Sequence, residues 1–466
     1  MTPVGKVGLH EECVGRPIAI DLFAGAGGMS LGFEQAGFDV VAALETDAAH
    51  AAAHRFNFPW CEVVRRDAAL TTGTDLSFAA ARGLAALGRP VDRGPRIDVV
   101  FGGPPCQGFS VGGLLDPEDP RNALVAHFAR IVSELRPKAF VLENVPAMAS
   151  RSLPGLDTPV PSWLAEEMAQ HGYVTSAPTV FNASCFGVPQ DRRRLIIVGV
   201  LERFSLPEPP IAMTRARPKR PGSRPKPWEA GHPRARTDLP IGPSVFDAIR
   251  DLPDLDSFGG LITKDEVRLS RDRRALMEAL FSEYAAVLSG SAGLSGDYSR
   301  PRRRQASMLT SSLRTTHTRD VIERFVEVAP GEVDGVSRLY RLHPEGVAPT
   351  LRAGSAPERG SYSAPRPIHP VHDRVVSVRE AARLSGFPDW FRFTAAKWHG
   401  FRQVGNAVCP PFARVVGAAV LEGLGLEPRS TRERFPLGNP NLLRVPSGAG
   451  RRTRNHIAAG TGGYQR

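Results

Sequence analysis

The stretch IAIDLFAGAGG, residues 18–28, decides the fold of this 466-residue chain. Its first five residues form a short apolar run typical of a buried strand, and a tight glycine turn follows before a helical pattern begins. Similar apolar runs alternate with amphipathic helical segments at residues 40–44, 97–101, 139–142 and 195–200. This alternation predicts an α/β fold with a mostly parallel sheet covered by helices on both faces.

Composition divides the chain into four parts. Residues 16–201 carry the strand and helix alternation, and residues 202–372 begin with a Pro- and Arg-rich linker that is too poor in large apolar residues to form a core. Regular patterns return at residues 373–426, where Ser377 and Glu380 predict a capping box at the start of a helix. The tail, residues 427–466, is rich in Gly, Pro, Asn and Arg and is predicted to be disordered.

The charge balance points to a polyanionic partner. The chain has 59 Lys and Arg against 48 Asp and Glu, a formal net charge of +11, and we expect the Arg-rich middle, including Arg302 to Arg304, to face that partner. No apolar run is long enough for a membrane span, and residues 1–15 contain acids where a signal peptide would have its apolar stretch. We therefore expect a cytoplasmic protein with no membrane partner.

The five cysteines are scattered without any C-x-x-C pair, which argues against a disulfide framework and against a Cys-rich metal site. No metal is expected. Four cysteines are predicted to be inert small apolar residues: Cys13, Cys61, Cys185 and Cys409. Cys106 differs, because it follows two prolines at the carboxyl end of a buried strand, where open parallel sheets bind ligands.

Acidic residues follow the glycine turn at spacings that suit a nucleotide-like ligand. Glu45 lies 20 residues after Gly25 at the end of the next strand, where it can accept hydrogen bonds from ribose hydroxyls. Asp67, after the third apolar stretch, can accept from an adenine amino group. The spacing F-x-G-x-G-G favours S-adenosylmethionine over a dinucleotide.

Two further strands end or begin in polar side chains. Glu143 follows the apolar residues 139–142, which places a carboxyl group at the same sheet edge as Cys106. Alternation in residues 190–194 turns Gln190, Arg192 and Arg194 to one face, where guanidinium groups can reach a base carbonyl or a phosphate. A solvated basic patch is the alternative interpretation of that segment.

These motifs, taken in order, resemble the cytosine-5 DNA methyltransferase family. The matching segments are DLFAGAGGMSLGF (21–33), PPCQGFS (104–110), RNAL (121–124), ENV (143–145), QDRRR (190–194), RVVSVREAARLSGFP (374–388) and QVGNAV (403–408). The resemblance covers residues 17–200 and 373–424. One departure is Cys409, which precedes the Pro410-Pro411 pair that often follows the valine more directly in this family.

The resemblance implies a Rossmann-like methyltransferase fold and a site for S-adenosylmethionine. The implied cofactor residues are Phe23, Gly25, Gly27, Glu45, Asp67, Pro104, Leu124, Asn406 and Val408. Cys106 would add to C6 of cytosine, Glu143 would hydrogen-bond N3 and the exocyclic amine, and Arg192 would bind O2. Gln190 and Arg194 would support that geometry.

The same resemblance implies a double-stranded DNA substrate whose target cytosine is flipped out of the helix. Residues 108–119 would close behind the flipped base, and residues 202–372 would hold the target-recognition region, with Thr350, Leu351 and residues 314–318 as contacts to DNA. We expect a monomer that acts as the modification enzyme of a bacterial restriction system, its cognate endonuclease acting separately, or as a solitary relative.

Three alternatives compete with this interpretation. Methylation of RNA uses the same chemistry, although the long basic middle region favours DNA. A nucleotide-binding oxidoreductase with a redox-active Cys106 would need a G-x-G-x-x-G turn and a resolving cysteine nearby, and the sequence has neither. A DNA-binding protein without activity is disfavoured because Cys106, Glu143 and Arg192 are all present.

Overall fold

An eight-stranded sheet forms the core of residues 16–201, the predicted catalytic domain, which is called the catalytic part below. The strand order is β3-β2-β1-β4-β5-β9-β6, with β7 also paired to β9. The computed structural model describes residues 15–91, 94–105, 124–153, 157–222, 238–303, 305–354, 366–431 and 433–444. The strands of this sheet are β1 (Ile18–Leu22), β2 (Asp39–Leu44), β3 (Glu62–Val64), β4 (Val99–Gly102), β5 (Ala139–Asn144), β6 (Tyr173–Thr175), β7 (Thr179–Asn182) and β9 (Arg193–Leu201). The strands β1 to β5 pair with one another in parallel, whereas β9 runs antiparallel to β5, β6 and β7. The predicted α/β fold is confirmed.

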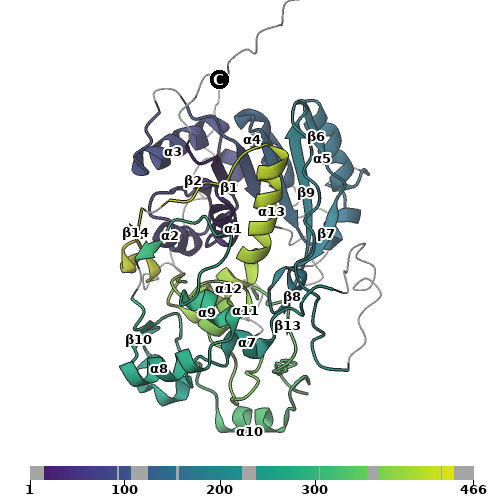
Figure 1. Cartoon of the computed structure of the whole chain (residues 1–466). Coiled ribbons are helices and arrows are strands. Elements are labelled where there is room, and N and C mark those ends of the chain that lie inside the picture. Colours follow the sequence, from purple (N-terminus) through teal and green to yellow (C-terminus); the bar gives the residue numbers. More distant parts are fainter. Residues whose placement is uncertain are drawn as a thin grey trace, which may run out of the picture.

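Helices cover both faces of this sheet, as Figure 1 shows. The first layer comprises α1 (Gly28–Ala36), α2 (Ala48–Asn57) and α13 (Pro410–Gly423), and α13 packs along α1. The helices α3 (Gly73–Ala86), α4 (Leu124–Leu135) and α5 (Val160–Ala169) contact one another in series. The chain thus returns, near its end, to the helix that follows its first strand.

The middle region is built from short elements around two small apolar clusters. Its helices are α7 (Val245–Ile249), α8 (Arg271–Ala279), α9 (Glu283–Ser289) and α10 (Arg319–Glu327), followed by α11 (Val378–Leu384) and α12 (Lys397–Asn406). Two-residue strands pair as β10 (Val267–Arg268) with β12 (Met308–Leu309), β11 (Arg302–Arg303) with β14 (Phe435–Pro436), and β13 (Ala348–Pro349) with β8 (Gln190–Asp191). The 3-10 helices are η1 (Ala68–Leu70), η3 (Pro146–Ser150), η4 (Ala183–Phe186), η5 (Leu255–Ser257), η6 (Gly259–Ile262) and η8 (Pro440–Leu443). The predicted capping box of Ser377 and Glu380 is present at α11.

The tail is ordered in part, so the prediction of disorder from residue 427 onward is wrong for residues 427–431 and 433–444. Residues 433–444 are here called the C-terminal strap. Phe435 packs edge-on against Trp60, with ring centroids 5.0 Å apart, and Leu443 is buried. The backbone carbonyl of Leu443 also accepts a hydrogen bond from the Ala395 amide at 2.9 Å. Burial of these two apolar side chains stabilises the strap, although its overall composition is rich in Gly and Pro. Residues 445–466 lie outside the described residues.

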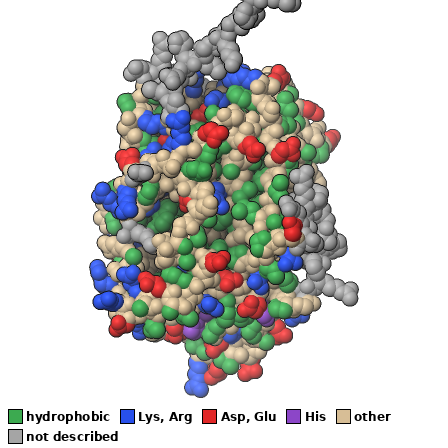
Figure 2. Space-filling model, in the orientation of Figure 1, with side chains coloured by type: hydrophobic (Ala, Val, Ile, Leu, Met, Phe, Trp, Pro, Cys, Tyr) green, Lys and Arg blue, Asp and Glu red, His purple; other side chains and the backbone are tan. Residues whose placement is uncertain are grey.

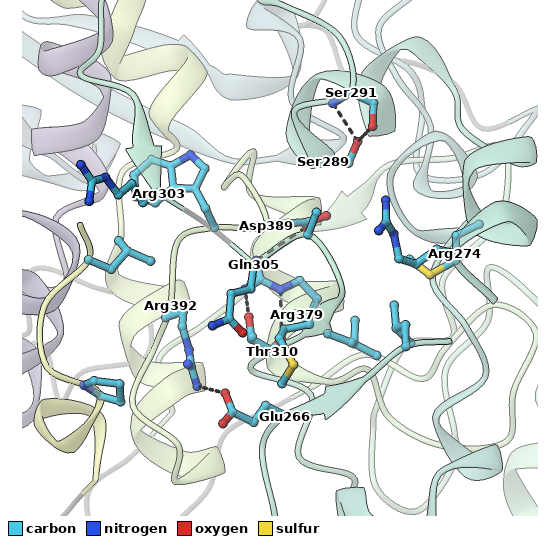
Figure 3. A pocket seen from close by; sticks show the side chains of 18 of the residues that line it. Glu266, Arg274, Ser289, Ser291, Arg303, Gln305, Thr310, Arg379, Asp389 and Arg392 are labelled. Atoms are coloured by element: carbon cyan, nitrogen blue, oxygen red, sulfur yellow. Dashed lines mark hydrogen bonds and ion pairs between the residues drawn. The ribbon is translucent and has the colours of Figure 1, made fainter. Parts of the chain in front are cut away.

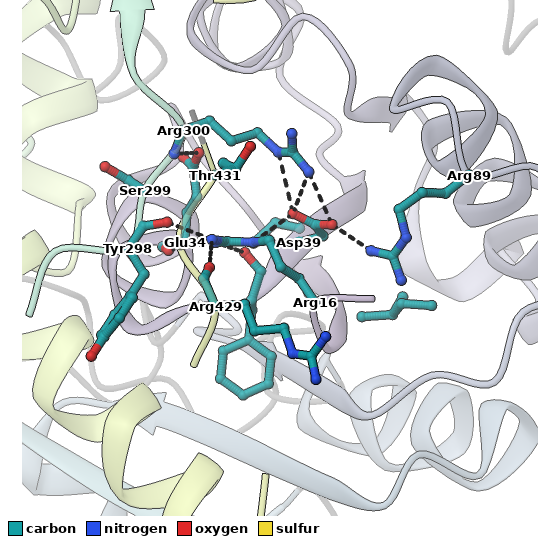
Figure 4. A network of polar contacts seen from close by, with 12 residues as sticks. Arg16, Glu34, Asp39, Arg89, Tyr298, Ser299, Arg300, Arg429 and Thr431 are labelled. Atoms are coloured by element: carbon teal, nitrogen blue, oxygen red, sulfur yellow. Dashed lines mark hydrogen bonds and ion pairs between the residues drawn. The ribbon is translucent and has the colours of Figure 1, made fainter. Parts of the chain in front are cut away.

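A buried ionic network ties the middle region to the catalytic part (Figure 4). The Asp39 carboxylate pairs with Arg16 at 2.9 Å and with Arg300 at 3.0 Å, and Arg302 pairs with Glu34 at 2.7 Å. The Arg302 side chain is only 1% exposed. The expectation that this arginine cluster faces a polyanionic partner is therefore wrong for Arg302, because its charge is neutralised inside the fold.

The surface in Figure 2 carries basic and acidic side chains interspersed, with no single basic field on this face. The stretch Lys397–Gly423 is the one part of the described chain that is long and apolar enough to cross a membrane, and 61% of its most apolar window is buried inside the protein. The apolar residues of this stretch therefore pack inside the protein, where α13 contacts α1 and α12 contacts α11.

Candidate active site

Four polar segments meet at one edge of the sheet. Because β1, β4 and β5 are adjacent and parallel, the glycine turn, residues 103–105 and Glu143 leave the sheet on the same side. The antiparallel β9 begins there, with Glu143 opposite Ile196. A Cβ atom on Gly103 would lie 2.5 Å from Oε2 of Glu143, so a side chain here would force the Glu143 carboxyl group to shift. The backbone leading toward Cys106 thus passes directly beside the carboxyl group.

In the sequence, the predicted nucleophile Cys106 follows Pro105. Pro104 is buried, and its carbonyl accepts a hydrogen bond from Nδ2 of Asn144 at 3.1 Å, while Pro105 is exposed. Cys106, the segment 108–119 and the arginine and asparagine of RNAL lie outside the described residues. Leu124, the last residue of that motif, begins α4 and packs partly buried against the core.

Glu143 is buried in a cationic environment. Its Oε1 atom lies 2.7 Å from Nε of Arg194, and the residue is 8% exposed. Burial raises the pKa of Glu143 above its usual range, while the positive charges of Arg194 and then Arg192 oppose the increase. A raised pKa makes this carboxyl group better able to hold a proton that it can share with a bound base.

Arg192 binds backbone carbonyls within the described residues, and its predicted contact to the base stays a prediction. Its side chain is buried, with Nη1 donating to the carbonyl of Leu351 at 3.1 Å and Nη2 to the carbonyl of Gly405 at 2.9 Å. Residue 192 lies between β8 and β9 rather than within either strand, so the alternation used for residues 190–194 is interrupted there. Arg194, within β9, is the arginine that reaches Glu143.

Gln190 is a buried connector. Its Nε2 donates to Oγ of Ser385 at 2.9 Å, and its Oε1 accepts from the amide of Leu351 at 3.3 Å. The residue is completely inaccessible to solvent. It supports the strand that carries the arginines and has no free polar atom facing the sheet edge.

The glycine turn and Glu45 form one unit. Oε2 of Glu45 accepts from the amide of Gly25 at 2.8 Å, and Oε1 accepts from the amide of Asp47 at 2.7 Å. Phe23, Gly25 and Gly27 all adopt positive φ angles, of 61°, 56° and 99°. At Gly27 a side chain would also collide with the ring of Phe58, so the turn needs glycine for both conformation and space.

The end of α12 packs against this turn. A Cβ atom on Gly28 would lie 2.5 Å from the carbonyl oxygen of Val408, which shows how closely the two backbones approach. Asn406, the last residue of α12, is exposed beside this contact. Asp67 follows β3, further along the same edge, where it is exposed and caps η1 through the amide of Ala69.

The proposed DNA contacts at Thr350 and Leu351 bind the catalytic part instead. The Thr350 hydroxyl donates to the carbonyl of Asp191 at 2.6 Å, and both backbone polar groups of Leu351 bind Gln190 or Arg192. In the segment 314–318, Arg314 pairs with Asp256 at 3.2 Å. The nearby Thr315 accepts from Arg366 at 2.9 Å.

A buried hydrogen-bond network of three side chains behind the glycine turn was not predicted from the sequence. Oγ of Ser30 lies 2.5 Å from Oδ2 of Asp21 and 3.0 Å from Nε2 of His54, and all three residues are buried. Burial raises the pKa of Asp21 to about 8 and lowers that of His54 to about 3, so the pair is neutral at pH 7. The available signal was an aspartate interrupting the apolar strand at residue 21.

Replacing Asp21 with asparagine is expected to reduce the pH dependence of stability. The folded-state pKa of Asp21 lies above the usual 3.8, so the folded protein binds the proton of this carboxyl group more tightly than the unfolded chain does. The resulting contribution to stability is fully present below about pH 4 and is lost as pH rises through about 8. Relative to wild type, the variant should gain on the order of 1–3 kcal/mol of unfolding free energy over that range. Denaturant unfolding at several pH values measures this gain, and parallel pH curves for the two proteins would contradict it.

The three cysteines within the described residues lie in or beside the packed core. Cys61 and Cys409 are buried, Cys185 is half-buried, and burial raises the pKa of both buried thiols. Cys13 lies outside the described residues. Within the described part of the chain, no group of three or more His, Cys, Asp and Glu residues is arranged to hold a metal ion.

A separate cavity of about 480 Å³ lies between α8, α9 and the C-terminal strap (Figure 3). Its wall includes Arg274, Arg303, Gln305 and Arg392, but none of the site residues predicted from the sequence. Arg392 is paired with Glu266 at 2.9 Å and Arg274 with Glu278 at 3.1 Å. The strand-end site and this cavity are therefore distinct.

Comparison with known proteins agrees with the motifs and geometry. The sequence profile described as "C-5 cytosine-specific DNA methylase" matches residues 18–422. The type II methyltransferase M.XorII of Xanthomonas oryzae pv. oryzae is 43% identical over 431 residues, covering 92% of this chain and 90% of the relative. The type II methyltransferase M.AgeI of Thalassovita gelatinovora is 30% identical, covering 86% of this chain and 98% of the relative.

A solved structure is also similar over nearly its whole length. It is a candidate DNA modification methyltransferase encoded within an E. coli prophage, with a TM-score of 0.63 and 30% identity. The match covers 88% of this chain and 99% of that one. These findings favour DNA over RNA as the substrate and leave no support for the oxidoreductase alternative. The chain belongs to the C-5 cytosine-specific DNA methylase family, whose reaction is the methylation of cytosine at C5 in DNA.

Proposed function

We propose that this enzyme methylates C5 of a cytosine flipped out of a specific double-stranded DNA sequence, through a covalent bond between Cys106 and C6 of the base. The observation that carries the proposal is the Glu143–Arg194 pair beside the backbone that leads to Cys106. A buried carboxyl with a raised pKa and a neighbouring guanidinium suit the N3, amine and O2 edge of cytosine.

S-adenosylmethionine is the methyl donor used by this family, and the residues at the sheet edge fit it. Glu45 has both carboxylate oxygens fixed by backbone amides, which orients their remaining lone pairs for ribose hydroxyls. Asp67 would accept from the adenine amine, and Phe23, Gly25 and Gly27 would surround the methionine portion. Pro104, Leu124, Asn406 and Val408 would complete the pocket. When bound, the cofactor supplies an electrophilic methyl group.

The protein side chains then prepare the base. The Cys106 thiolate adds to C6, and the electron pair displaced from the C5–C6 bond makes C5 nucleophilic. Glu143 shares its proton with N3, and Arg194, which lies beside Glu143, takes the O2 role in this proposal, while Arg192 binds two backbone carbonyls. After the methyl group is transferred, loss of the C5 proton drives elimination of the cysteine and restores the ring.

The relatives support a biological setting for this proposal. Both named relatives are type II methyltransferases, which supports a role as the modification enzyme of a restriction system, with the endonuclease as a separate protein, or as a solitary enzyme. Such an enzyme acts in the bacterial cytoplasm on nucleoid DNA. One asymmetric site per chain needs no symmetry partner, so we propose a monomer.

Expression in a methylation-free bacterial host, followed by base-resolution mapping of 5-methylcytosine, tests this function. The expected result is methylation at one recurring sequence in host DNA and none in host RNA. Methylation confined to RNA, or no methylation by a folded enzyme, would contradict the proposal. The same map reports the recognition sequence.

A further inference from the structure

Arg192 bridges two segments, one in the middle region and one at the end of α12. Its Nη1 atom binds the carbonyl of Leu351 and its Nη2 atom binds the carbonyl of Gly405. Leu351 lies where the middle region rejoins the catalytic part, and Gly405 directly precedes Asn406 of the cofactor site. A single planar fork therefore holds both segments.

The Leu351 side is fastened to the catalytic strand. The strands β13 and β8 pair in parallel, the Thr350 hydroxyl donates to the carbonyl of Asp191, and the Leu351 amide donates to Gln190. Residues 348–351 thus cannot shift without moving the strand that leads to Arg194. Residues 348–351 therefore form a contact through which DNA binding by the middle region would affect the position of Arg194.

The Gly405 side touches the same segment directly. A Cβ atom on Gly405 would lie 2.6 Å from the amide nitrogen of Ala353, so the backbone of residues 352–353 packs on the end of α12. Three residues later, the carbonyl of Val408 packs against Gly28 at the start of α1. The end of α12 is consequently held between the cofactor turn and the entrance of the middle region.

We propose that Arg192 is a positioning residue that couples cofactor binding to DNA binding. The inference rests on the proposed function and goes beyond it. A cofactor that contacts Asn406 and Val408 fixes the end of α12, and Arg192 transmits this constraint to residues 350–353. Lysine keeps the positive charge but has no fork that can hold two carbonyls at once, so Arg192→Lys should uncouple the two sites.

The test compares the affinity for a target DNA duplex with and without saturating S-adenosylhomocysteine, measured by fluorescence anisotropy. In the wild type, the cofactor product should tighten DNA binding by a factor in the range of about 5 to 150. In Arg192→Lys this ratio should fall to within about twofold of unity. The single-turnover rate with both ligands saturating should stay within about tenfold of wild type, because the Glu143–Arg194 pair is unchanged.

Arg341→Lys is the matched control. Arg341 is also buried and donates to a backbone carbonyl, that of Phe325, but it lies in the middle region away from the α12 junction. It should lower stability and leave the affinity ratio at its wild-type value. Thr350→Val provides a second variant in case Arg192→Lys does not fold, since it removes only the bond to Asp191 and should lower the ratio at least twofold.

Four outcomes separate the hypotheses. A folded Arg192→Lys enzyme with a wild-type ratio overturns the coupling, and so does a wild-type enzyme that methylates DNA but shows no change in DNA affinity with the cofactor product. If Arg192→Lys does not fold, a wild-type ratio in Thr350→Val also overturns it. A wild-type enzyme that neither binds nor methylates DNA refutes the proposed function itself.

Discussion

Replacing Cys106 with serine will reduce methyl transfer by about 10³-fold or more, while binding of DNA and cofactor persists. Addition to C6 requires a thiolate, and a serine hydroxyl is far less acidic and is a much weaker nucleophile at neutral pH. Transfer of a tritiated methyl group to target DNA measures the rate. Gel shift with the same DNA and isothermal calorimetry with S-adenosylhomocysteine measure the two binding steps.

The matched control for this variant is Cys185→Ser. Cys185 is the described cysteine with the greatest exposure, and it comes from η4, outside the strand-end site. Its replacement should leave the rate within about twofold of wild type. A Cys106→Ser enzyme with a rate comparable to this control would show that the reaction does not proceed through Cys106.

Replacing Glu143 with glutamine is expected to lower the rate constant by about 10²- to 10⁴-fold and to remove its alkaline decline. Burial raises the pKa of Glu143, so the carboxyl retains its proton to higher pH than an exposed glutamate does. If that proton must be shared with N3, the wild-type rate falls as pH rises through the raised pKa. An amide does not titrate, so the residual rate of the variant lacks this limb.

Arg194→Gln tests the direction of the same effect. Arg194 is the largest opponent of the raised pKa, because its Nε lies 2.7 Å from the carboxylate. Removing its charge should move the alkaline limb to higher pH as well as lower the rate. Single-turnover rates from mildly acidic to alkaline pH measure both variants, and a limb that stays in place in both would assign it to another group.

The sequence was sufficient for the strand ends but not for the pairing between them. The glycine turn, Glu45 and Glu143 could be predicted because each lies within a few residues of an apolar run that defines its strand. Which arginine meets Glu143 depends on the antiparallel register of β9, in which Ile196 lies opposite Glu143. In that register Arg194 is a diagonal neighbour on the same face, which no local pattern reveals.

Burial of charge was equally invisible in the sequence. Arg302 contributes to the net charge like any other arginine, but it lies among aromatic rings, 4.4 Å from the ring centroid of Trp60 and 4.8 Å from that of Trp390. Its acidic partner, Glu34, is almost 270 residues away in the chain. Composition counts such a residue as surface charge, whereas only the tertiary contacts show that it stabilises the fold.

The packing of α13 on α1 has a consequence for how the enzyme is made. These helices come from nearly opposite ends of the chain, and the C-terminal strap, which packs on Trp60 and α2, follows α13 in the sequence. A nascent chain on the ribosome therefore lacks part of its core, including the helix that packs on α1, until translation is almost complete. Such long-range closure is slow and leaves apolar surface exposed meanwhile, so chaperone demand during synthesis should be high.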